Sequence, residues 1–132
     1  MTLTPELKAL AIVTAATSLM WMPYVLARMA VLGIWPTMSS DAALQPLRHA
    51  WAERAKRAHA NAVEGLAVFA PLVLIAAAVG ASSAGTVLAA QGYLAARLVH
   101  YAAYVAGVPG LRTVAFLAGW ACTLPFIAIL LG

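Results

Sequence analysis

Four polar side chains share one face of a long helical segment in the first half of the chain. They are separated by three, four and three residues and comprise Arg54, Arg57, Asn61 and Glu64. At about 100° per residue they fall within an arc of about 80°, which makes one polar stripe. Guanidinium groups bind carboxylates, and a glutamate binds an amino group. The stripe therefore fits a zwitterionic, strongly polar ligand.

A second polar face follows in the next apolar segment. It comprises Arg97, His100 and Tyr104, separated by three and four residues, and Arg112 follows after a short turn. These groups lie at a depth comparable with Asn61 if the two segments cross a membrane as neighbours. We therefore expect one membrane layer to collect arginine, asparagine, glutamate, histidine and tyrosine side chains. An apolar bundle beside that layer would admit a lipophilic second substrate. Adjacent polar and lipophilic sites are what an enzyme needs to conjugate a water-soluble thiol to a membrane-dissolved electrophile.

The stripe also has a purely structural interpretation. Arg54 and Arg57 could extend to lipid headgroups, and Glu64 could serve as an internal ion-pair partner. However, neither Asn61 nor Glu64 gains by facing lipid, and a carboxylate within a membrane marks function by default. The four residues together favour a functional stripe.

The elements that position these groups are predicted to be membrane helices. Of the 132 residues, 64% are hydrophobic and only 9% are charged, and the mean hydropathy is +0.92. Soluble domains carry about 25% charged residues, so an ordinary soluble domain is excluded. The basic residues are not interleaved with exposed aromatics on a soluble face, which argues against a nucleic acid partner. The single cysteine, Cys122, and the absence of Cys/His pairs with ligand spacing predict no metal site.

The length allows four membrane spans in one all-α domain, residues 1–132, because each span needs about 20 residues. Thr4 and Pro5 are typical of a helix start. The predicted fold is an integral membrane four-helix bundle. Loops are expected at residues 33–46, 80–85 and 107–110, and the spans at about residues 7–32, 47–79, 86–106 and 111–131.

The basic residues predict how this bundle is oriented. Both termini and the 80–85 turn share one side, where Lys8 is the only basic residue, while Arg97 lies within the third span. The positive-inside rule therefore places both termini outside the cytoplasm. The alanine-rich composition is like that of bacterial chains and predicts the inner membrane. The other side collects six of the eight basic residues: Arg28, Arg48, Arg54, Lys56, Arg57 and Arg112.

The residues from Arg54 to Glu64 resemble the R-x-x-x-N-x-x-E motif of the MAPEG family, the membrane-associated proteins in eicosanoid and glutathione metabolism. The segment from Arg97 to Tyr104 is similar to the family's R-x-x-[HY]-x-x-x-Y motif, and Arg112 resembles the arginine that follows it. The resemblance covers essentially the whole chain, which is similar to bacterial-type members that resemble the microsomal glutathione transferases. Phe116 and Ala60 replace a tyrosine and an arginine of prostaglandin synthase relatives, which disfavours eicosanoid activities.

The resemblance implies a homotrimer with glutathione, a co-substrate, bound between neighbouring subunits near the cytoplasmic face. Arg112 would stabilise the glutathione thiolate, with the Tyr104 hydroxyl as the second choice. His59 would reach the site from the adjacent subunit. The implied glutathione-binding residues, taken with the polar stripe, are Arg54, Arg57, His59, Asn61, Glu64, His100 and Tyr104.

The function expected on these grounds is a membrane glutathione transferase or peroxidase acting on a small hydrophobic substrate. Two alternatives stay open. A non-catalytic lipid-binding scaffold would keep the fold and the trimer. A small proton-coupled exporter would use one membrane glutamate, although such exporters place it in an otherwise apolar helix, whereas Glu64 follows an arginine stripe.

Overall fold

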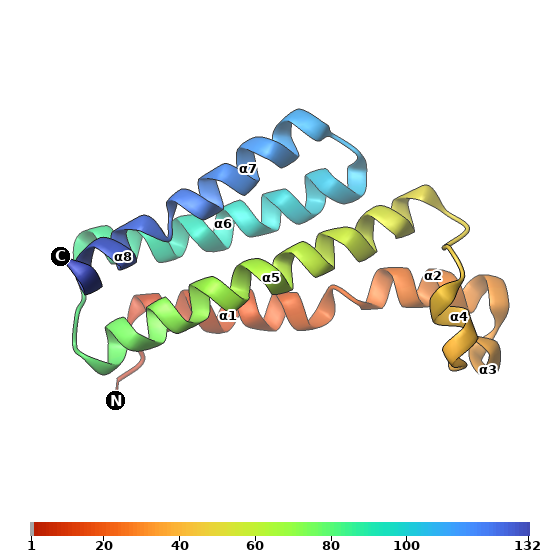
Figure 1. Cartoon of the computed structure of the whole chain (residues 1–132), viewed down its shortest axis with the longest axis horizontal. Coiled ribbons are helices and arrows are strands. Elements are labelled where there is room, and N and C mark those ends of the chain that lie inside the picture. Colours follow the sequence, from red (N-terminus) through yellow and green to blue (C-terminus); the bar gives the residue numbers. More distant parts are fainter. Residues whose placement is uncertain (1) are drawn as a thin grey trace.

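A computed structural model describes residues 2–132 as an all-helical chain in which no strand occurs (Figure 1). The expectation of an all-α fold is confirmed. The helices are α1 (Pro5–Leu19), α2 (Met22–Leu32), α3 (Ile34–Thr37), α4 (Ser40–Leu44), α5 (Ala50–Ala78), α6 (Ala84–Ala106), α7 (Pro109–Ala121) and α8 (Leu124–Leu131).

The first and last apolar segments are each divided into two helices, although the sequence predicted continuous helices there. The first begins as expected, with the Thr4 hydroxyl accepting from the Leu7 amide. It is interrupted between α1 and α2, just before Pro23, and the last is interrupted between α7 and α8, just before Pro125. Proline has no amide hydrogen for the bond to the carbonyl four residues earlier, which accounts for both interruptions.

The two central helices match their predicted boundaries to within a few residues. α5 is continuous through Pro71, and residues 79–83 form the turn between its end at Ala78 and the start of α6 at Ala84. Ser83 caps the start of α6, its hydroxyl accepting from the Thr86 amide. Gly107 ends α6 with φ of 77°, a left-handed conformation that favours glycine.

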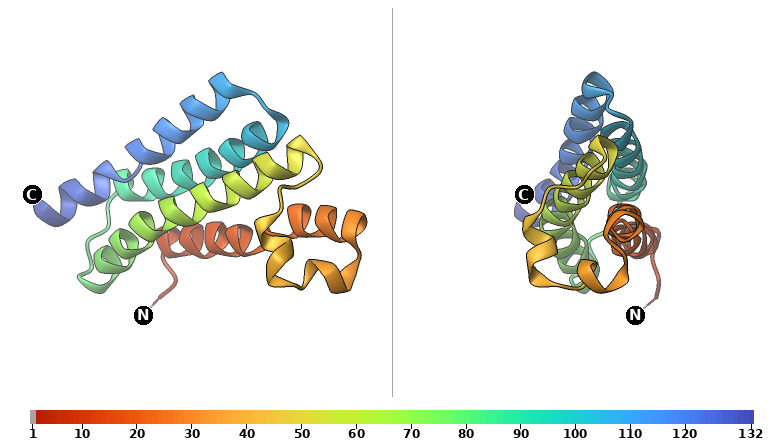
Figure 2. Two further views of the ribbon diagram at one scale, coloured as in Figure 1. Left: turned by 45° about the vertical axis from the view of Figure 1, so that its right-hand side comes forward. Right: turned by 90° about the vertical axis from the view of Figure 1, so that its right-hand side faces the viewer.

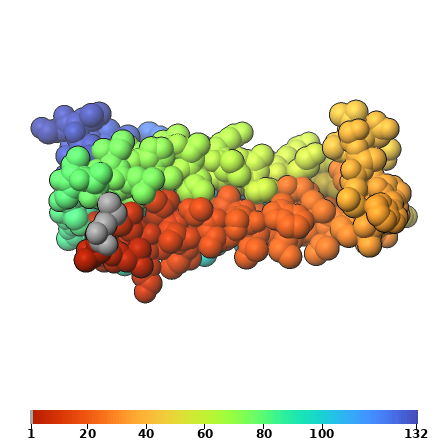
Figure 3. All heavy atoms as spheres, turned by 90° about the horizontal axis from the view of Figure 1, so that it is seen from below, coloured from red at the N-terminus to blue at the C-terminus, as the bar shows by residue number. Residues whose placement is uncertain are grey.

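Residues 33–46 were predicted as a loop, but they contain the short helices α3 and α4. The Ser39 hydroxyl caps α4 by accepting from the Ala42 amide. Arg28 of α2 donates to the backbone carbonyls of Ala42 and Gln45, which holds α4 against the end of α2. Figure 3 shows this segment as an extension at one end of the molecule.

The long helices lie side by side and α6 is at the centre, in contact with α1, α5 and α7 (Figures 1 and 2). Both chain ends and the α5–α6 turn lie at one end, while α3, α4 and the α6–α7 turn lie at the other. This arrangement agrees with the sidedness deduced from the sequence.

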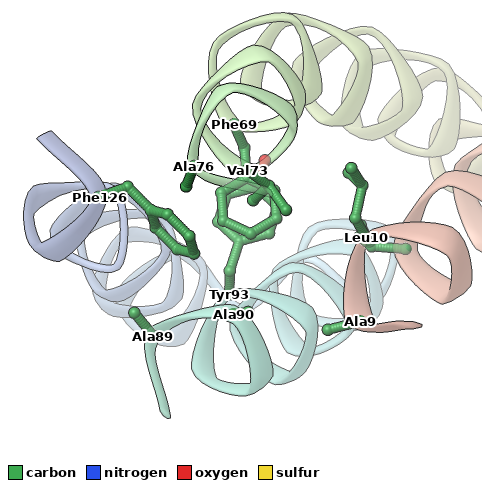
Figure 4. Close-up of a cluster of buried hydrophobic side chains, with 10 residues drawn as sticks. Ala9, Leu10, Phe69, Val73, Ala76, Ala89, Ala90, Tyr93 and Phe126 are labelled. Carbon is green, nitrogen blue, oxygen red and sulfur yellow. The ribbon is translucent and has the colours of Figure 1, made fainter. Parts of the chain in front are cut away.

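The core between α5, α6 and α8 is built on three aromatic rings (Figure 4). Phe69 and Tyr93 stack with their centroids 3.7 Å apart, and Phe126 meets Phe69 edge-on at 5.7 Å. Small residues such as Ala90, which is fully buried, allow the helix backbones to approach closely around these rings.

Three helical segments are long and apolar enough to cross a membrane: Pro5–Leu32, Ala50–Ala78 and Pro109–Leu131. The protein is therefore an integral membrane protein. α6, expected as the fourth span, is not among the three. It has 23 residues, but its apolar character is diluted by polar side chains such as Gln91, Arg97 and His100. Arg97 and His100 are buried against other helices rather than exposed.

Candidate functional site

Arg54 joins α5 to the last turn of α6. Its Nε donates to the Val105 carbonyl over 2.9 Å. A Cβ added at Gly107 would lie 3.3 Å from the Arg54 Cζ, so the glycine gives the guanidinium room. The C-terminal carbonyls of a helix are unsatisfied and partly negative, which favours a cation there. This arginine therefore fixes the end of α6 that carries His100 and Tyr104.

Arg97 is the polar centre of the arrangement, although it is only 5% exposed. Its Nη1 donates to Asn61 Oδ1 over 3.0 Å, linking α6 to the polar stripe on α5. Its Cζ lies 5.1 Å from the Tyr93 ring centroid and 5.5 Å from that of Phe116, within range of cation–π attraction. The charge is thus held by an amide and two aromatic faces.

Two glycines make room for this buried guanidinium. A Cβ at Gly65 of α5 would lie 2.5 Å from Arg97 Nη2, and a Cβ at Gly119 of α7 would lie 3.2 Å from Arg97 Nε. Since any larger residue would displace the side chain, both helices approach α6 closely only because these positions lack a side chain.

A groove of about 220 Å³ opens beside Arg97, between α5 and α7. Asn61, Glu64 and Arg97 form its polar wall. Glu64 is exposed, so its carboxylate is accessible from outside the chain. The apolar part of its lining comprises Val68, one turn beyond Glu64 on α5, and Phe116 and Trp120 on α7. Charged groups and a large apolar surface are therefore adjacent in one groove.

His100, Tyr104 and Arg112 lie together next to this groove. The His100 ring is 5.6 Å from the Tyr104 ring in an edge arrangement and 6.2 Å from that of Phe116. The Arg112 guanidinium stacks over Tyr104 at 4.6 Å. α7 begins at Pro109, so Arg112 sits in its first turn and returns to the level of Tyr104. The structure thus brings together the two residues expected to activate a thiol.

Three predicted site residues of α5 do not line the groove within one chain. Arg54 binds the end of α6 instead. Arg57 is exposed, one turn before Asn61 on α5. His59 faces α2, where its Nδ1 lies 2.8 Å from the Tyr24 hydroxyl. A role for His59 in the site would therefore require a neighbouring copy of the chain.

Sequence reasoning left two arginines without a role. The central position of Arg97 was missed, although its spacing from His100 and Tyr104 already put it on the same face. Gly65 was missed too, and only a structure reveals that it makes room for Arg97. Arg28 anchors α4, a contact that no sequence signal indicated.

The part of the chain that the structure describes contains no cluster of three His, Cys, Asp or Glu residues able to hold a metal ion. Cys122 lies half-buried, and its Sγ would be 3.0 Å from a Cβ added at Gly92. The charged side chains that line the groove are Glu64 and Arg97.

The fold and the groove define an all-helical membrane protein with a polar site between α5, α6 and α7. Residues 9–132 match the MAPEG family model, nearly the whole chain. The chain belongs to the MAPEG family. No curated protein and no solved structure matches it.

Proposed function

We propose that this protein is a membrane glutathione transferase that conjugates the glutathione thiolate to a lipophilic electrophile. The observation that carries the proposal is the groove in which Asn61, Glu64 and Arg97 lie beside an apolar lining. Family membership is consistent with this role. A polar tripeptide and a hydrophobic substrate would meet at the boundary between the polar and apolar parts of the lining.

The exposed charged side chains are complementary to the ammonium and carboxylate groups of glutathione. Glu64 would bind the ammonium group of the tripeptide, and Arg57, about two turns earlier on α5, would bind a carboxylate. The hydrogen bond from Arg97 orients Asn61, so the side-chain amide of Asn61 would be positioned to form a hydrogen bond with the peptide backbone of glutathione. His100, stacked against Tyr104, would line the same site.

Arg112 would supply the thiol activation. A free thiol has a pKa near 8.5, so lowering it by about two units requires about 2.7 kcal/mol at 1.36 kcal/mol per unit. One or two charge-assisted hydrogen bonds of about 1.5–3 kcal/mol each supply that. The thiol proton would leave to water, and the sulfur lone pair would form the new bond to the electrophilic carbon as its leaving group departs.

The groove is open along the outer face of one chain, since Glu64 and Trp120 are both exposed. We infer that a neighbouring copy completes it in a homotrimer, where His59 would reach the adjacent site. In this arrangement α6 is the fourth span, screened from lipid by its neighbours. The end with α3, α4 and Arg112 would face the cytoplasm, and both termini the opposite side.

Calorimetric titration of glutathione into the purified protein tests the proposal. Glu64→Gln and Arg57→Ala should each weaken binding about tenfold to a hundredfold, because each removes a charged contact of about 1.5–3 kcal/mol. Lys56→Ala is the matched control, since Lys56 is an exposed cation next to Arg57 and off the polar stripe. It should leave the affinity unchanged.

Two results would contradict the proposal. Wild-type protein that binds no glutathione at millimolar concentration would favour a lipid-binding scaffold or a proton-coupled exporter. If Glu64→Gln lowered only thermal stability and left a measurable affinity intact, Glu64 would be an internal structural group.

A further inference from the structure

A buried carboxylate lies at the other end of the molecule, in the first turn of α1. Glu6 is only 4% exposed. Its Oε1 accepts hydrogen bonds from Ser82 Oγ at 2.6 Å and Thr86 Oγ1 at 2.9 Å. Its Oε2 has no hydrogen-bond partner within residues 2–132. One oxygen thus ties α1 to the start of α6, while the other is left unsatisfied.

Glu6 is part of the wall of a cavity of about 300 Å³. This volume lies at the lower end of the range for small-molecule sites. Thr4 and Ser82 line the polar side with Glu6, and the opposite side is apolar, comprising Val73, Ala77 and Phe126. Figure 4 shows Val73 and Phe126 projecting from α5 and α8 at this edge of the core.

The hydrogen bonds that join α1 to the start of α6 do not by themselves explain why a carboxylate is buried at Glu6. Two hydroxyl donors converge on one oxygen, and burying a charged oxygen without a donor is costly. No lysine or arginine is present in the cavity wall to compensate the charge. The last side-chain torsion of a glutamate is broad, so the carboxylate can adjust to a donor placed in the cavity that Glu6 lines.

We propose that this cavity binds a primary ammonium group carried on a small apolar body. The ammonium donates to the Glu6 carboxylate, and the hydrocarbon packs against Val73, Ala77 and Phe126. Such a ligand supplies both the missing donor and the missing positive charge. An amphipathic amine from solution and the ethanolamine headgroup of a membrane lipid share this chemistry.

The cavity is separate from the proposed glutathione groove. Thr86, which binds Glu6, and Arg97, which lines the groove, lie 11 residues apart on α6, which corresponds to about 17 Å along the helix axis, and the cavity and the groove share no lining residue. A test of the amine site is therefore independent of whether the protein is a transferase.

Fluorine NMR of 4-fluorophenethylamine with the protein in phosphatidylcholine nanodiscs tests the site. The matched neutral probe is 2-(4-fluorophenyl)ethanol, which has the same ring and chain. The wild type should bind the amine at least about tenfold more tightly than the alcohol, and Glu6→Gln should remove that preference. Asp41→Asn, which neutralises an exposed carboxylate in α4, should retain it.

Glu6→Gln also perturbs the contact between α1 and α6, so a second variant leaves that contact intact. Ala77→Leu fills the cavity from the α5 side without touching the hydrogen bonds of Glu6. It should abolish binding of both probes. The proposal is overturned if the wild type does not prefer the amine, or if Ala77→Leu binds it as the wild type does. Equal losses in Glu6→Gln and Asp41→Asn would overturn it as well.

Repeating the titration with phosphatidylethanolamine in the nanodiscs distinguishes the two sources. Displacement of the fluorinated amine by this lipid would identify the occupant as a headgroup. Undiminished binding would identify a soluble amine. In phosphatidylcholine nanodiscs, where this competitor is absent, Glu6→Gln should lose the preference for the amine whichever source supplies the natural ligand.

Discussion

Replacing Gly65 by alanine gives a direct test of the buried arginine. The new Cβ would lie 2.5 Å from Arg97 Nη2, 2.8 Å from its Cζ and 3.0 Å from the Tyr93 hydroxyl. Because these distances are too short for non-bonded atoms, the guanidinium must move. Its bond to Asn61 is then lost.

The expected cost follows from three contributions. Overpacking a tight site costs about 1–3 kcal/mol. An interhelical hydrogen bond in a membrane protein contributes about 0.6–1.7 kcal/mol. Alanine in place of glycine within a helix recovers about 1 kcal/mol. We therefore expect Gly65→Ala to lower the free energy of unfolding by about 1–4 kcal/mol.

Gly85→Ala is the matched control, since it makes the same change in the first turn of α6. There the nearest atom to the new Cβ, Ser83 Oγ, lies at an ordinary 3.5 Å. The unfolding free energy should stay constant or rise by up to about 1 kcal/mol. Tryptophan fluorescence during reversible unfolding in mixed micelles measures both variants. If Gly65→Ala were as stable as Gly85→Ala, the packing described around Arg97 would be wrong.

Three further predictions concern the proposed activity and assembly. Arg112→Ala should raise the pKa of the bound glutathione thiol by a unit or more, measured by the ultraviolet absorbance of the thiolate. Tyr104→Phe should have the smaller effect, because a neutral donor stabilises an anion less than a charged donor does. A larger effect of Tyr104→Phe would exchange the roles of the two residues. In a Cys122→Ala background, a thiol reagent should label Ser40→Cys from the cytoplasmic side and Ala84→Cys from the opposite side. Labelling of Ala84→Cys from the cytoplasm would refute the orientation. Native mass spectrometry in mild detergent should give the mass of three chains, and a monomer would contradict the trimer.

The sequence predicted the helices well because apolar composition and helix-capping residues act locally. Thr4 and Gly107 start and end helices as their types indicate. The interruptions were less predictable, since Pro23 and Pro125 lie just after interruptions while Pro71 sits inside continuous α5. A proline costs each helix similar local energy, and tertiary packing decides whether the helix continues.

The candidate site was predictable as a set of residues but not as a set of contacts. Spacing alone put Asn61 and Glu64 on one face and His100 with Tyr104 on another. The central position of Arg97 depends on which helices meet and how closely, as the clash at Gly65 shows. The spacing of residues along one helix does not indicate how closely that helix approaches another.

The aromatic core has a bioenergetic consequence. Along α6 the order is Thr86, then Tyr93, then Arg97, so the rings lie between two polar ends. Phe69 and Phe126 are fully buried and Tyr93 is 1% exposed. Protons cross a membrane protein along files of water, and a dry hydrophobic constriction interrupts such a file. In a membrane, we expect this layer to exclude water between the buried Glu6 and the buried Arg97, so that no file of water joins these two charged groups through the interior of one chain.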